Sequence, residues 1–198
     1  MLFPVNDLAE VCLFVWGSAG TGKTLILMEA LKIKLSKLRS LGRRVRILAT
    51  TFYDWQSELR KKFDEKYLEN MKDVEVVSVL ELCGDLDIEF NKYTPRDTMN
   101  RVITALSDSS DTEVVLLLID EVPPCHEKQT SPDWRHLEVK ENVIWLLALS
   151  PRAFSANSTE VLPPEDSYVL TRHLVVKHRN CPQIRNIIMT INIPFKEC

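Results

Sequence analysis

Glycine is scarce in this sequence. Only five of its 198 residues are glycine, and three of those five fall within one octapeptide. Long apolar runs are lacking as well: no stretch reaches the roughly 18 apolar residues of a membrane-spanning helix, so we expect no membrane association. The formal net charge is only −3. The chain therefore does not have the strong positive charge of a protein that holds nucleic acid by electrostatic attraction alone.

A disulfide framework is also lacking. The five cysteines are odd in number and scattered, and no two of them form a C-x-x-C pair, which indicates free thiols in a reducing compartment. The N-terminus has no basic segment, and Asp7 and Glu10 interrupt its apolar residues, so no secretory signal is expected. These features predict an intracellular protein, cytoplasmic or nuclear.

Segments with strand and helix patterns alternate along the chain. A continuous apolar run predicts a strand buried on both faces, and apolar residues at helical spacing predict a helix. The expected strands are Val11–Trp16, Val45–Ala49, Val74–Val79, Glu113–Ile119, Asn142–Leu149 and Tyr168–Val176. The expected helices are Lys23–Arg39 (ended by Gly42), Tyr53–Leu68, one that starts at Thr94-Pro95, and Cys181–Met189. This order predicts one α/β domain over residues 1–198, with a mainly parallel sheet covered by helices on both faces.

The glycine-rich octapeptide carries the most specific signal. It matches the pattern G-x-x-x-x-G-K-[ST], with an expected strand before it and an expected helix after it. Its members are Gly17, Ser18, Ala19, Gly20, Thr21, Gly22, Lys23 and Thr24. Such a loop turns its backbone N–H groups toward phosphate groups, and a Cβ would obstruct that approach. The pattern predicts a phosphate-binding loop (P-loop) in which Lys23 reaches the β- and γ-phosphates and Thr24 binds Mg²⁺.

An apolar strand that ends in two acids supplies a second part of this site. Val114–Ile119 should deliver Asp120 to the carboxyl edge of the sheet, beside the P-loop. There Asp120 can hold Mg²⁺, commonly through water. Glu121 follows directly and is the expected catalytic base that orients or deprotonates an attacking water.

Taken together, these motifs resemble the first motor domain of superfamily 1 helicases, the UvrD/Rep-like and Schlafen-like group. Further segments resemble motifs of this family in the same order: motif Ia at Val45–Phe63, motif III at Val143–Phe154 and motif IV at Leu170–Ile184. The resemblance implies a three-layer, RecA-like P-loop fold, ATP with Mg²⁺, and a second catalytic residue, Arg179, that touches the γ-phosphate. It also implies two partners besides the nucleotide: single-stranded nucleic acid, and a second motor domain or larger polypeptide.

Three departures from the family pattern qualify these expectations. The γ-phosphate-sensing glutamine of motif III is missing from Leu149–Ala153, and no glutamine motif for adenine precedes Val11. The second motor domain does not follow within these residues, so we expect weak hydrolysis or none by this chain alone, since other arginines supply much of the charge stabilisation in the transition state. A nucleotide-dependent signalling switch of the NACHT/STAND kind is the alternative to a helicase-like function, because Leu147–Arg152 also resembles the sensor strand of those proteins. A small-molecule kinase is disfavoured because no arginine-rich lid appears.

The expected contact with nucleic acid has alternatives of its own. Phe52 and Trp55 could stack on bases or pack a helix onto the sheet. The basic clusters Lys32–Arg46 and Arg60–Lys66 could form a patch for nucleic acid or a solvated helix face.

Overall fold

The computed structural model of this protein describes residues 12–17, 21–52, 56–64, 74–91, 94–109, 113–120, 122, 137–149 and 169–174. Six strands occur in this part of the chain: β1 (Cys12–Gly17), β2 (Arg44–Thr51), β3 (Val74–Ser78), β4 (Glu113–Asp120), β5 (Val143–Leu149) and β6 (Val169–Leu174). Four helices accompany them: α1 (Lys23–Ser40), α2 (Gln56–Asp64), α3 (Val79–Asp85) and α4 (Pro95–Ser109).

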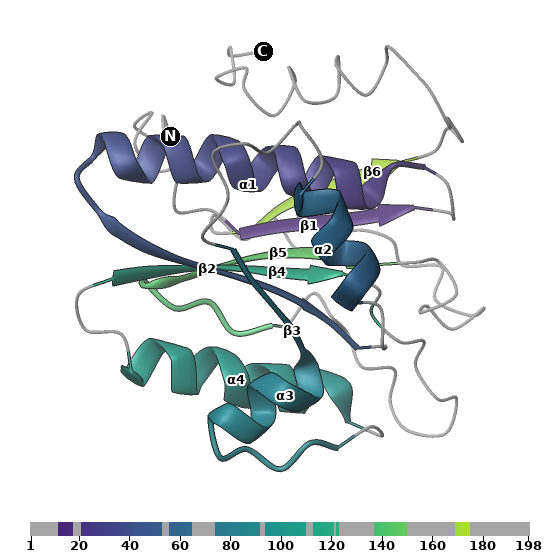
Figure 1. Ribbon diagram of the computed structural model, residues 1–198, viewed down its shortest axis with the longest axis vertical. Coiled ribbons are helices and arrows are strands. Elements are labelled where there is room, and N and C mark those ends of the chain that lie inside the picture. Colours follow the sequence, from purple (N-terminus) through teal and green to yellow (C-terminus); the bar gives the residue numbers. More distant parts are fainter. Residues whose placement is uncertain are drawn as a thin grey trace.

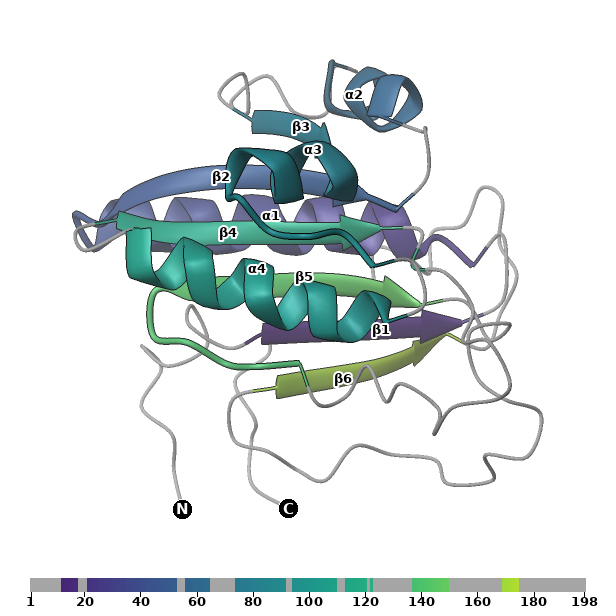
Figure 2. The same cartoon turned by 90° about the horizontal axis from the view of Figure 1, so that it is seen from below.

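The six strands form one sheet in the order β3-β2-β4-β5-β1-β6, and each neighbouring pair is parallel. Helix α1 lies on one face of this sheet, whereas α3 and α4 lie on the other (Figures 1 and 2). The expected mainly parallel sheet with helices on both faces is therefore confirmed. No helix in the described ranges is long and apolar enough to cross a membrane.

The central strands are apolar along their length because both of their faces are covered. Every residue of β5 is buried, and so is every residue of β4 after Glu113. Parallel strands between two helix layers have no solvent-facing side, so their sequences are continuous apolar runs and do not alternate with polar residues. These two strands hold the centre of the sheet, between β2 and β1.

Helix α1 begins and ends where glycine permits a left-handed backbone. Gly22 precedes the helix with φ 85°, and Gly42 follows it with φ 73°. The Arg43 amide donates to the Leu38 carbonyl at 3.0 Å, which closes the C-terminal turn around Gly42. The predicted termination of this helix at Gly42 is confirmed.

The region around β3 differs from its prediction. The strand ends at Ser78, and α3 begins at Val79, the residue at which the predicted strand ended. Ser78 and Glu81 form a capping box: the Glu81 amide donates to Ser78 Oγ at 3.0 Å, and the Ser78 amide donates to Glu81 Oε2 at 2.8 Å. The pattern S-x-x-E was present in the sequence and could have revealed this helix.

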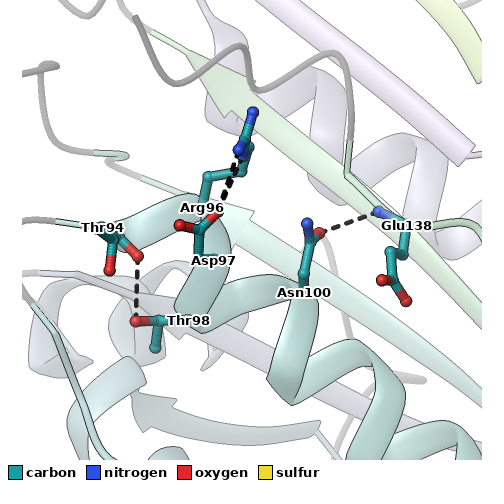
Figure 3. A network of polar contacts seen from close by, with 6 residues as sticks. All are labelled: Thr94, Arg96, Asp97, Thr98, Asn100 and Glu138. Carbon is teal, nitrogen blue, oxygen red and sulfur yellow. Dashed lines mark hydrogen bonds and ion pairs between the residues drawn. The ribbon is translucent and has the colours of Figure 1, made fainter. Parts of the chain in front are cut away.

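Helix α4 starts at Pro95, as predicted, and holds the segment that leads into β5. The Asn100 side chain accepts a hydrogen bond from the Glu138 amide at 3.0 Å (Figure 3), and Thr104 Oγ1 donates to Glu138 Oε2 at 2.9 Å. On the strand side, the buried Trp145 indole N–H donates to the Glu138 carbonyl at 2.9 Å. These contacts fix the entry into β5, the strand that separates β4 from β1.

The predicted closing helix Cys181–Met189 lies outside the described residues, as do the ends of the predicted helix Tyr53–Leu68 on either side of α2.

Candidate functional site

The carboxyl ends of the central strands lie along one edge of the sheet, because all six strands run in the same direction. At this edge β1 ends at Gly17 and β4 ends at Asp120, with β5 between them. Two strand spacings amount to roughly 10 Å. In open α/β sheets, ligands bind at this edge, outside the carboxyl ends of the strands.

The amino end of α1 faces this edge. The first intrahelical hydrogen bond runs from the Ile26 amide to the Gly22 carbonyl, at 3.1 Å. The amides that precede Ile26 in the first turn lie at the positive end of the helix dipole. Gly22 has no side chain that could cap them, and its left-handed backbone is one that a residue with a Cβ rarely adopts. An anion is the ligand that such a turn favours.

The two predicted metal ligands, Thr24 and Asp120, are in contact. Thr24 Oγ1 donates a hydrogen bond to Asp120 Oδ2 at 2.8 Å. Thr24 is partly buried in the first turn of α1, and the Asp120 side chain is buried at the end of β4. The structure thus places the carboxylate beside the helix start, which is the arrangement expected from the sequence.

A magnesium ion is compatible with this pair. Mg²⁺ prefers oxygen ligands and commonly takes only one or two from the protein, with water and substrate phosphates as the others. Thr24 and Asp120 supply a hydroxyl and a carboxylate. Within the ranges that the structure describes, no group of three or more His, Cys, Asp or Glu side chains could form an all-protein metal site.

The structure describes only part of the predicted site. The described residues of this site are Gly17, Thr21, Gly22, Lys23, Thr24 and Asp120. All of these except Gly17 lie at or near the start of α1. Outside the described residues are Ser18, Ala19, Gly20, Glu121 and Arg179.

The structure shows the surroundings of Phe52, one of the two aromatic residues considered for base stacking. The Phe52 side chain is partly buried and packs against the hydrophobic core, in agreement with the packing alternative for this residue. Trp55 lies outside the described residues.

Sequence reasoning missed Thr51. This buried residue is the last of β2, and its Cα pairs with that of Asp120 on the neighbouring strand. Its position in a Thr-rich strand end was visible in the sequence, but the pairing of β2 with β4 was not.

Comparison with known proteins gave no match to any protein-family model or any curated protein, so the arrangement of the described side chains is the basis for assigning a function.

Proposed function

We propose that this chain is a P-loop NTPase domain of the RecA-like kind that binds ATP together with Mg²⁺. The single observation that carries the proposal is the hydrogen bond between Thr24 and Asp120, residues from two segments that meet at the carboxyl edge of a parallel sheet. A Lys-Thr pair at a helix start beside a strand-end aspartate is the arrangement that P-loop NTPases use for a nucleoside triphosphate and its metal.

Each described residue has a role in binding the triphosphate. The amides at the start of α1 donate to phosphate oxygens, and the left-handed Gly22 lets the backbone approach them. The Lys23 ammonium balances charge on the β- and γ-phosphates as a point charge. Thr24 and Asp120 would hold the metal, which when bound would neutralise negative charge on the phosphates.

Turnover requires groups beyond these four residues. In the proposal, Glu121 orients and deprotonates the attacking water, and Arg179 stabilises negative charge on the γ-phosphate. Both assignments come from the sequence alone. We propose that the chain resembles the first motor domain of a superfamily 1 helicase and hydrolyses ATP weakly or not at all without a second domain.

The first experiment measures ATP binding by calorimetry in the presence of Mg²⁺. We expect saturable binding to the wild-type protein. The Glu121→Gln variant should retain this affinity and lose whatever turnover the wild type shows, because the amide keeps the shape of the side chain but cannot accept a proton. Absence of nucleotide binding to a folded wild-type protein contradicts the proposal.

The second experiment distinguishes the helicase-like function from a signalling switch. ATPase activity is measured with and without single-stranded DNA and RNA. Stimulation by either polymer supports the helicase-like function. Tightly retained nucleotide with no stimulation favours a switch of the NACHT/STAND kind, in which Leu147–Arg152 would form the sensor.

A further inference from the structure

Asp120 has a second threonine beside it, on the neighbouring strand. In the register of β2 and β4, the Cα atom of Thr51 pairs with that of Asp120. Side chains of paired residues on adjacent strands project from the same face of a sheet. Because Thr24 contacts Asp120 from α1, that face is the one covered by α1. Asp120 therefore shares its face of the sheet with two threonines, Thr24 of α1 and Thr51 of β2.

Burial makes this second hydroxyl significant. Thr51 is only 1% exposed and Asp120 only 4% exposed. A buried hydroxyl needs an acceptor, and an ionised carboxylate has two oxygens that accept several hydrogen bonds. Thr24 donates to Oδ2. A donor on the β2 side can hold the other oxygen, Oδ1.

We propose that Thr51 is a positioning residue for Asp120: its hydroxyl holds the carboxylate in the orientation that presents Oδ2 to Thr24 and to the metal. Thr51 does not touch the metal and acts through Asp120. This role rests on the proposed function, because it concerns the metal site of that function. Partners of this kind, which orient a metal ligand, typically contribute 10- to 100-fold to metal affinity.

The neighbouring Thr50 provides a matched control. It is also a buried threonine of β2, but it pairs with Ile119 and so projects from the opposite face of the sheet. Its hydroxyl has no hydrogen-bond partner in the described part of the chain. Replacing either threonine with valine removes one hydroxyl from a buried site and preserves the side-chain shape.

The test is the Mg²⁺ concentration required for half-maximal ATP binding. In Thr51→Val we expect this concentration to rise about tenfold or more, while Thr51→Ser, which keeps a hydroxyl, stays within about twofold of wild type. Thr50→Val should match wild type. Equal Mg²⁺ dependence in wild type and Thr51→Val overturns the proposal, and so does an equal loss in Thr51→Val and Thr51→Ser.

A crystal structure of the nucleotide-free Thr51→Val variant gives a readout that does not depend on nucleotide. We expect the Asp120 carboxylate to turn and the distance from Thr24 Oγ1 to Asp120 Oδ2 to lengthen from 2.8 Å. An unchanged carboxylate overturns the positioning role. If the carboxylate turns but the wild-type protein binds no Mg²⁺-ATP, the positioning role stands and the proposed nucleotide function fails.

Discussion

Thr24 and Asp120 are 96 residues apart in the chain, and the hydroxyl of the first donates a hydrogen bond of 2.8 Å to the carboxylate of the second. The parallel sheet creates this contact. Strand β1 leads into the loop before α1, β4 ends at Asp120, and both strands end at the same edge. A hydroxyl and a carboxylate are thereby joined at the positive end of a helix dipole, where an anion is favoured.

Replacement of Thr24 by valine should separate metal binding from nucleotide binding. The substitution removes the hydroxyl that would bind Mg²⁺ and leaves the backbone amides of the helix start in place. We expect the Mg²⁺ concentration for half-maximal ATP binding to rise by at least about tenfold. The measurement is a calorimetric Mg²⁺ titration. Binding of ATP in EDTA is the control and should change little; an unaltered Mg²⁺ requirement would remove Thr24 from the site.

Replacement of Lys23 by alanine should have a different outcome, since both proposed metal ligands remain. The loss of one charge-assisted contact to the phosphates corresponds to about 100-fold in affinity, enough to abolish detectable binding at ordinary concentrations. Lys32→Ala is the matched control, because Lys32 is an exposed lysine farther along the same helix. Equal nucleotide affinity in the wild type and in Lys23→Ala would show that the phosphates bind elsewhere.

The sequence predicted the central part of the fold well because its signals are local. The continuous apolar runs of β4 and β5 reflect burial on two faces, and the glycines that flank α1 reflect left-handed backbone positions. These features require no knowledge of distant contacts. The strand before the glycine-rich octapeptide, the helix after it and the apolar strand that ends at Asp120 were therefore placed to within two residues.

The parts that escaped prediction depend on pairing between distant segments. The pairing of Thr51 with Asp120 follows from the position of β2 beside β4, and no local pattern encodes that neighbourhood. The hydrogen bonds between α4 and Glu138 also join segments that are distant in the sequence, and no local pattern predicts them. Helix α3 differs from both, because its capping box at Ser78 is a local signal. It was overlooked because the preceding strand pattern extended to Val79.

The capping box gives a prediction about stability. Ser78→Ala removes the hydroxyl that accepts from the Glu81 amide at the start of α3. The expected loss is about 1 kcal/mol in the free energy of unfolding, measured by urea denaturation. Ser40→Ala is the control: the Ser40 hydroxyl donates to a carbonyl at the exposed end of α1, so its loss should cost much less. Equal effects of the two substitutions would contradict a capping role for Ser78.

The capping interaction should also weaken in acid. The pKa of Glu81 is lowered, first by the hydrogen bond that it accepts from the Ser78 amide and then by its hydrogen bonds with Gln56 and the Ser78 hydroxyl. A carboxylate with a lowered pKa contributes stability that is present above its unfolded pKa and is lost as the pH falls through the folded one. Ser78→Ala keeps the residue-78 amide and loses only the hydroxyl that donates to Glu81 Oε2. The difference between wild type and Ser78→Ala should therefore shrink on acidification by the part that this one hydrogen bond contributes.

Lys34 is a lysine buried on the sheet-facing side of α1, and its charge should make the stability of the protein depend on pH. Its side chain is only 9% exposed, and burial lowers its pKa from 10.5 to about 8. The nearby Lys37 also lowers this pKa, and Cys12 opposes the shift. Near pH 7 the folded protein therefore carries a buried ammonium group, at a cost of up to about 3 kcal/mol relative to the unfolded chain.

The pH dependence follows from the sign of this shift. Between pH 8 and pH 10.5 the unfolded chain holds a proton on Lys34 that the folded chain has released, so this residue makes stability rise with pH in that window. Lys34→Met should be more stable than wild type at pH 7, and its advantage should shrink as the pH approaches 10. Urea denaturation at pH 7, 8.5 and 10 measures both effects. Lys32→Met, at an exposed position of α1, should show neither. A destabilised Lys34→Met variant at pH 7 would mean that the ammonium group contributes more through its contacts than its burial costs.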